Sequence, residues 1–296
     1  MDNLENLHNK VQGARDLKSV VKSMKAMAAS NITQFEAAAN SLGDYYRTVA
    51  LGIIAYLKSE NIKTIVENRD RKKFGEKRVF AIVFGSDQGL VGQFNDNLSA
   101  FVTLSLKKFP GKKEVWVIGE RVQLLLQDEG HRITNTFPVP TAVGAITDLV
   151  NQILIRSEEI NEKTGREAFY IFHNEPKPGS GYRPVMHQFL PLDEKWENTL
   201  RELRWPTKLP PQVAGGARPT LLALISEYLF VSLFKACAES LASENASRLE
   251  AMQRAEKNIE DILGELEMKI QGLRQRSIDE ELFDVISGFE ALVHHE

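Results

Sequence analysis

Apolar residues recur at alternating steps of three and four positions along both ends of the chain. Such stepping over many turns is typical of a coiled-coil seam and does not fit a strand. The first stripe consists of Leu4, Leu7, Val11, Ala14, Leu17, Val21, Met24, Ala28, Ile32, Phe35, Ala39, Leu42, Tyr46, Val49, Ile53 and Tyr56. The second consists of Tyr228, Val231, Phe234, Ala238, Leu241, Asn245, Leu249, Met252, Ala255, Ile259, Leu263, Leu266, Ile270 and Leu273, and it resumes as Ile278, Leu282, Val285, Phe289 and Leu292.

The prolines support this division of the chain. All 11 lie between Pro110 and Pro219, so both striped ends are free of helix breakers. We therefore predict an N-terminal coiled-coil helix over 1–60, an α/β globular domain over 75–210, and a C-terminal coiled-coil helix over 219–296. The two helices are expected to pair antiparallel into a rod, with the globular domain inserted between them.

The two predicted helices differ in length. At 1.5 Å per residue, about 70 residues from Thr220 would extend on the order of 100 Å, and the first arm only about 85 Å. One end of the longer helix should therefore project alone or contact other proteins.

The middle of the chain alternates between short apolar runs and helical patterns. Strands are predicted at 79–84, 114–119, 131–137 and 168–174, followed by a hairpin into 184–192. Helices are predicted at 96–108, 121–130 and 143–161. This alternation indicates a Rossmann-like α/β domain with a mainly parallel sheet.

A glycine-rich turn, GSDQGLVG, follows the first predicted strand, where a phosphate-binding loop would lie. It matches neither GxGxxG nor the GK[ST] fingerprint, and no acidic residue ends the next strand. The favoured interpretation is that Gly85, Gly89 and Gly92 allow a sharp structural turn into the helix. No cofactor is predicted.

Composition narrows the function classes. The net charge of −3 does not suggest nucleic acid as a partner, and no apolar run reaches the roughly 20 residues that span a bilayer, so no membrane insertion is expected. The polar N-terminus predicts no signal peptide. The single Cys237 fits a reducing compartment and a buried, inert thiol. The six histidines show no metal-ligand spacing beyond a terminal pair, and no catalytic motif occurs.

Four segments nevertheless resemble one family, the gamma subunit of F-type rotary ATP synthases. ASENASRLEAMQRAEKN (242–258) and LRQRSIDEELFDVISGFEAL (273–292) are similar to its C-terminal signatures. SDQGLVGQFN (86–95) is similar to its SD-x-GLCG turn, and KSMKAMAAS (22–30) to a segment of its first helix. The resemblance spans the whole chain in order.

The resemblance implies a non-catalytic central-stalk rotor that transmits torque between a membrane c-ring, driven by H⁺ or Na⁺, and the catalytic sites of an alpha/beta hexamer. The implied partners are the alpha and beta subunits, the epsilon subunit and the c-ring. The implied location is the cytoplasmic side of a bacterial inner membrane, as a peripheral part of the complex.

The resemblance also implies a partner-binding site for the beta subunit. Arg274 and Gln275 match the family's Arg-Gln pair, and Lys22, Met24 and Lys25 match the residues near the beta subunit's acidic lever. The chain departs from the family at 31–34, where Asn-Ile-Thr-Gln replaces a basic cluster.

Two alternatives stay open from the residues alone. One is a coiled-coil adaptor with a nucleotide-sensing α/β domain, which would bind ATP tightly in isolation. The other is a free-standing enzyme, which would turn over substrate without partners.

Overall fold

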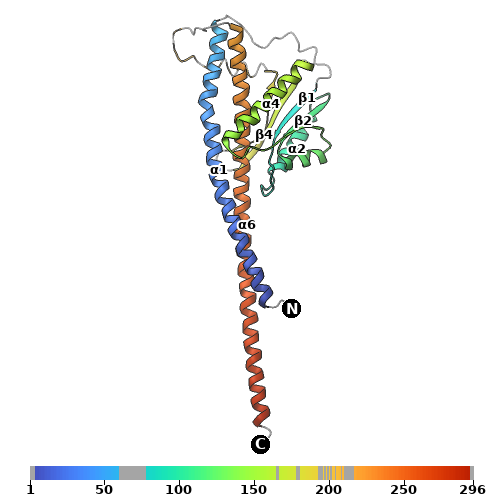
Figure 1. Cartoon of the computed structure of the whole chain (residues 1–296), viewed down its shortest axis with the longest axis vertical. Helices are drawn as coiled ribbons and strands as arrows, with labels where there is room; N and C mark the ends of the chain where they lie inside the picture. Colours follow the sequence, from blue (N-terminus) through green and yellow to red (C-terminus); the bar gives the residue numbers. More distant parts are fainter. Residues whose placement is uncertain are drawn as a thin grey trace. The chain divides into compact units, whose positions relative to one another are not determined.

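The structure, a computed structural model, describes residues 4–59, 78–164, 167–177, 181–192 and 217–293, with scattered positions between 196 and 209. The predicted boundaries near 60, 75 and 210 lie outside the described residues, so the domain limits stay a prediction. The elements, several of which carry labels in Figure 1, are α1 (Leu4–Ser59), β1 (Val79–Phe84), α2 (Phe94–Leu106), β2 (Lys113–Ile118), α3 (Glu120–Asp128), β3 (Ile133–Phe137), α4 (Val143–Thr164), β4 (Ala168–Pro176), β5 (Tyr182–Leu190) and α6 (Ala217–Val293).

The predicted fold class is confirmed: two long terminal helices flank an α/β domain with a mainly parallel sheet. The sheet has the order β3-β2-β1-β4-β5, in which β5 alone is antiparallel. The central strand β1 is buried along its full length, as its continuous apolar run predicts. The chain divides into two compact units, one of residues 28–248 and one of residues 1–27 with 249–296.

In the unit of residues 28–248, the alternation of β1 side chains builds two cores. Val79, Ala81 and Val83 face α2 and α3. On the opposite face, Phe80 and Ile82 pack with α4 and with the first half of α6. Helices therefore cover both faces of the sheet.

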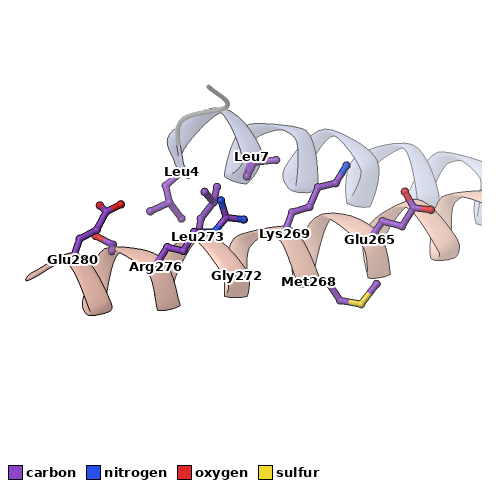
Figure 2. Close-up of a pocket in the computed structure, with 10 residues that line it drawn as sticks. Leu4, Leu7, Glu265, Met268, Lys269, Gly272, Leu273, Arg276 and Glu280 are labelled. Atoms are coloured by element: carbon purple, nitrogen blue, oxygen red, sulfur yellow. The ribbon is translucent and has the colours of Figure 1, made fainter. Parts of the chain in front are cut away.

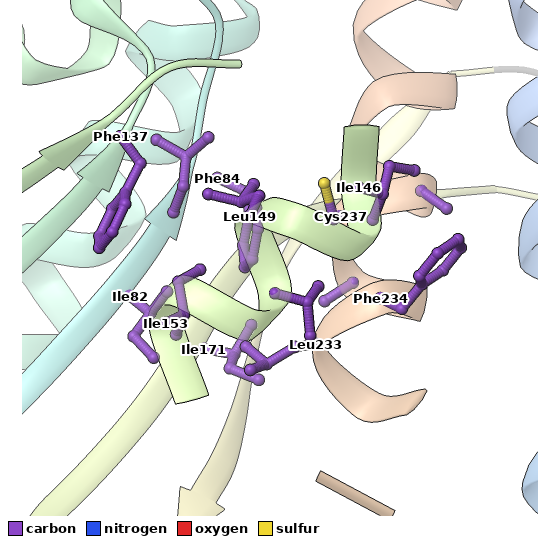
Figure 3. Packing of buried hydrophobic residues seen from close by; sticks show 14 of the residues in the cluster. Ile82, Phe84, Phe137, Ile146, Leu149, Ile153, Ile171, Leu233, Phe234 and Cys237 are labelled. Atoms are coloured by element: carbon purple, nitrogen blue, oxygen red, sulfur yellow. The ribbon is translucent and has the colours of Figure 1, made fainter. Parts of the chain in front are cut away.

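Helix α4 packs against both the sheet and α6. Figure 3 shows Leu149 of α4 beside Phe84 of β1, Ile153 of α4 beside Ile82 of β1, and Ile146 of α4 beside Cys237 of α6. Cys237 is 1% exposed and unpaired, which confirms its predicted burial, and burial raises the pKa of its thiol.

Helix α6 contains a stretch that is long and apolar enough to cross a membrane by length and composition. Leu229, Val231 and Leu233 of this helix are buried within the unit of residues 28–248. Packing against the sheet and α1 therefore accounts for apolar residues here, and the absence of membrane insertion stays a prediction.

In the other unit, α1 and α6 pair antiparallel, and the predicted stripe of α6 is buried or half-buried from Met252 to Leu273. One predicted seam position of α1 is wrong. Leu17 is 54% exposed, while Lys18 is half-buried and faces α6. The seam steps by four from Ala14 to Lys18 and then by three to Val21. The aliphatic stem of a lysine can line a seam while its ammonium group reaches a carboxylate. The apolar pattern therefore assigned the seam position to Leu17, although Lys18 occupies it.

Candidate functional site

A row of three serines on α6 meets the carboxyl edge of the sheet. Ser240 Oγ donates a hydrogen bond of 2.9 Å to the carbonyl of Phe84, at the end of β1. Ser243 Oγ donates one of 2.9 Å to the carbonyl of Asn174 in β4. Ser247 Oγ donates one of 2.6 Å to the carbonyl of Val91, in the glycine-rich turn.

The spacing of these serines explains why one helix can make all three bonds. Positions i, i+3 and i+7 fall on one face of an α-helix. The three side chains are buried, with exposed fractions of 3%, 1% and 6%. Each hydroxyl therefore satisfies a carbonyl that water does not reach.

This contact lies at the place where α/β domains usually bind ligands. In an open parallel sheet, ligands bind beyond the carboxyl ends of the strands, where the strand order reverses. Here the order reverses between β1 and β4, whose carbonyls Ser240 and Ser243 contact. Helix α6 therefore lies across the edge that a nucleotide would need.

The three glycines of the turn differ in what they contribute. A Cβ at Gly85 would lie 2.2 Å from Cγ1 of Val122, so the close packing of α3 requires glycine there. Gly92 has a φ of 55°, which favours glycine. At Gly89 a Cβ would meet nothing nearer than Arg121 at 3.9 Å.

Side chains within the turn hold its shape. Asn95 Oδ1 accepts from the backbone N–H of Ser86 at 3.1 Å, and Asn95 Nδ2 donates to Ser86 Oγ at 2.8 Å. Asp87 accepts from the N–H groups of Glu120 and Val139, which follow β2 and β3. The turn is thus tied to the ends of the neighbouring strands, and Asp87 has a structural partner for each oxygen.

A buried ion pair lies beside the serine row. Arg248 Nη2 lies 2.8 Å from Glu244 Oε1, and Glu244 is only 5% exposed. Burial raises the pKa of the Glu244 carboxyl to about 7, although Arg248 lowers it in part and Asp87 adds a smaller increase. This carboxyl therefore changes charge near neutral pH.

A second tie joins the sheet to α6. Nε2 of His173 in β4 lies 3.0 Å from Oε2 of Glu239 in α6, and the side chain of His173 is 2% exposed. Burial acts to raise the Glu239 pKa, but the hydrogen bond and charge of His173, together with Lys235, lower it overall.

In the unit of residues 1–27 and 249–296, a ladder of ion pairs joins α1 to α6. Its three rungs are Arg15–Glu267 at 3.1 Å, Lys18–Glu260 at 2.8 Å and Lys25–Glu256 at 2.5 Å. The Lys25 hydrogen bond lowers the pKa of the Glu256 carboxyl against a smaller opposing effect of desolvation. Along the ladder the residue numbers of α1 rise while those of α6 fall, as expected for two antiparallel helices.

The predicted residues of the first helix occupy three different environments. Lys25 is engaged by Glu256 within the chain, and Met24 packs half-buried against the seam around Met252. Lys22 is exposed. Of the three, only Lys22 presents its side chain mainly to solvent.

Arg274 and Gln275 are both exposed on α6. Their sequence neighbours Leu273 and Arg276 line a groove of about 980 Å³, shown in Figure 2, where the first turn of α1 meets α6. Its lining residues are Leu4, Leu7, Glu265, Met268, Lys269, Gly272, Leu273, Arg276, Ser277 and Glu280. The structure therefore separates the five predicted partner residues into two places on the paired helices, about Lys22 and about Arg274.

The sequence pattern did not predict the serine row, although a signal was present. Ser240, Ser243 and Ser247 form a polar line in a segment of α6 where Ala238, Leu241 and Ala242 are buried apolar residues. Ser243 and Ser247 belong to the block 242–258, and Val91 belongs to the turn 86–95. The structure brings these two motifs into contact across a sequence separation of 156 residues.

Known proteins were compared with the chain by sequence and by structure. A family model described as ATP synthase matches residues 3–292. The ATP synthase gamma chain of Pasteurella multocida is 25% identical over 99% of this chain and all of its own length, and that of Dechloromonas aromatica is 26% identical over 97% and 98%.

Two solved structures share the fold. A chain of the Euglena gracilis mitochondrial ATP synthase (OSCP/F1/c-ring, rotational state 3) aligns with a TM-score of 0.60 and 14% identity. The alignment covers 98% of this chain and 94% of the Euglena chain. A chain of the Tetrahymena thermophila mitochondrial ATP synthase central stalk/c-ring aligns with a TM-score of 0.54, 17% identity, and 80% and 99% coverage.

Proposed function

We infer, because the chain belongs to the ATP synthase family and matches gamma chains along their full length, that it is the rotor subunit of the central stalk of a rotary ATP synthase. Its work is mechanical: it transmits torque between the membrane c-ring and the catalytic sites of the alpha/beta hexamer. We propose that the chain itself is non-catalytic and that the beta subunits carry out the chemistry of ATP.

The observation that carries this function is a group of exposed apolar side chains near the end of α6. Leu4, at the start of the described α1, lines a groove with residues 265–280 of α6. Beyond it, Leu282, Phe283 and Val285 are 57%, 69% and 70% exposed. Apolar side chains at this density favour burial against another protein. A sleeve of alpha and beta subunits around the helix would cover them on every side.

The finer contacts are proposals. Arg274 and Gln275 project from this part of α6 and would hydrogen-bond a loop of the beta subunit. Lys22 would reach the acidic lever of the beta subunit, with Met24 in the seam behind it. Lys25 would have to break its ion pair with Glu256 before it could reach that lever. We therefore expect Lys25 to contribute less than Lys22 to binding of the beta subunit.

The α/β domain would contact the epsilon subunit and the c-ring, which places the chain at the surface of a membrane as part of a complex. For a bacterial chain this is the cytoplasmic face of the inner membrane. No membrane insertion of the chain is required for this role.

A nucleotide-sensing adaptor is less well supported. The edge of the sheet where a nucleotide would bind is the edge that Ser240 and Ser243 of α6 contact. Measurement of ATP binding to the purified chain separates the two functions, because an adaptor of this kind would bind ATP tightly without partners.

Coexpression with alpha and beta subunits from the same genome tests the rotor function. We expect a stable complex with ATPase activity, and we expect Leu282→Asp with Val285→Asp to weaken it. Leu104→Asp is the control, because Leu104 is 62% exposed on α2, outside the paired helices. A chain that forms no complex with any such beta subunit would not be a rotor.

A further inference from the structure

The junction between α6 and the sheet has a mechanical requirement that apolar packing alone does not meet. Apolar burial is favourable in many relative positions, because it depends on area and has no direction. A rotor that carries torque from its α/β domain to its long helix must resist sliding and rotation between them. Directional bonds at fixed positions supply that resistance.

The three serine bonds have the required geometry. They attach one face of α6 to three separate backbone points: the end of β1, the neighbouring strand β4, and the turn that follows β1. Three points that do not share one strand fix both the position of the helix along its axis and its rotation about that axis. Backbone carbonyls are rigid acceptors because the sheet holds them.

We propose that Ser240, Ser243 and Ser247 form a torque clamp that locks the α/β domain to the long helix. The proposal rests on the rotor function inferred above. The three serines are positioning residues, because their hydroxyls bond to backbone carbonyls of the chain itself. In the proposed arrangement, the edge of the sheet that other α/β domains use for a ligand serves as a socket for the rotor's own helix.

Removal of the hydroxyls should loosen the socket while the apolar core keeps the domain in place. Each hydrogen bond lost to alanine raises the population of displaced arrangements by about fivefold, because the net value of such a bond is modest. Under an opposing ion gradient, the displaced arrangements let the helix turn without the domain. ATP hydrolysis then continues while fewer ions are moved per ATP.

The test uses the complete ATP synthase in sealed vesicles. Hydrolysis of ATP and ion uptake are measured together, with and without an opposing gradient, for the variant with Ser240→Ala, Ser243→Ala and Ser247→Ala. We expect the number of ions moved per ATP to fall, most strongly against the gradient. Ser243→Ala alone should show a smaller fall in the same direction, and it serves if the triple variant does not assemble.

Ser232→Ala is the matched control, because Ser232 lies on the same helix and its hydroxyl donates to the carbonyl of Tyr228 in that helix, with no bond to a strand among the described residues. Its ratio of ions to ATP should equal that of the unmodified complex. An unchanged ratio in the triple and single variants, with only a lower melting temperature, would overturn the clamp and leave the serines a role in stability. Failure of the unmodified chain to assemble or pump would instead reject the rotor function, and with it the clamp.

Discussion

The two halves of α6 are held in different ways. From Leu229 to Arg248 the helix lies against a sheet and is fixed by buried serines and by the contact of Glu239 with His173 of β4. From Leu249 onward it meets only α1 among the described residues of its unit, through a narrow apolar seam and a ladder of partly exposed ion pairs. The first half is built for a fixed position, while the second is built for a pairing that leaves most of its surface available to other proteins.

The largest expected contrast concerns apolar residues of the two regions. Leu233→Ala removes a fully buried side chain from the core between the sheet and α6, and should lower the free energy of unfolding by about 2–5 kcal/mol. Leu17→Ala removes a side chain that is 54% exposed, and should change the free energy of unfolding by less than about 0.5 kcal/mol. Urea unfolding of the full chain measures both. Equal losses of stability in the two variants would mean that Leu17 does occupy a buried seam position.

A smaller effect is expected at the turn. Gly85→Ala places a methyl group against Val122 and should cost about 1–3 kcal/mol, since the close packing leaves no space for it. Gly89→Ala is the control, because space is available there. If the contact with Val122 is the cause, Val122→Ala added to Gly85→Ala should cost less than the sum of the two single changes. Purely additive losses would point to a different cause.

The buried ion pair makes stability depend on pH. The pKa of Glu244 is raised to about 7 in the folded chain, above its value in the unfolded chain, so its contribution to stability is complete at low pH and is lost as the pH rises through 7. Glu244→Gln cannot ionise, and its stability relative to the unmodified chain should rise by up to about 3 kcal/mol between pH 4 and 8.

Urea unfolding at several pH values measures this difference. Glu250→Gln is the control, because Glu250 forms the same i,i+4 pair with Arg254 but is 50% exposed. Its stability relative to the unmodified chain should show little dependence on pH. A Glu244→Gln difference that also stays flat from pH 4 to 8 would mean that Glu244 ionises normally.

The smallest effects are expected in the ladder of the second region. Glu260→Gln should cost about 0.2–1 kcal/mol at low salt, because the pair with Lys18 is partly exposed. The loss should shrink in 1 M NaCl as screening increases, and Lys18→Glu combined with Glu260→Lys should recover it. A loss that salt does not change would indicate that packing, and not charge, joins the helices here.

Much of the fold follows from local pattern. The run at 79–84 is continuously apolar because β1 is covered on both faces, and its predicted limits agree with the structure. The stripe of α6 predicted its buried side correctly along the paired helices. Leu17 was assigned wrongly because a lysine can occupy a seam position, and apolar pattern alone does not register the stem of a charged residue.

The site was less accessible to sequence reasoning. The resemblance indicated Arg274, Gln275 and Lys22 as partner residues, but it gave no reason for the serines of the same signature. Their role depends on which carbonyls lie opposite, and that is decided by contacts between segments 156 residues apart. The engagement of Lys25 by Glu256 likewise depends on the relative register of two distant helices.

The most direct test of the rotor function is observation of rotation. Cys237 is buried, so a single thiol introduced by Lys108→Cys, at an exposed position just beyond α2, can carry a label on the α/β domain. With the alpha/beta hexamer fixed to a surface and ATP supplied, the label should rotate in one direction and stop when ATP is removed. A label that stays still while the same complexes hydrolyse ATP would contradict the account.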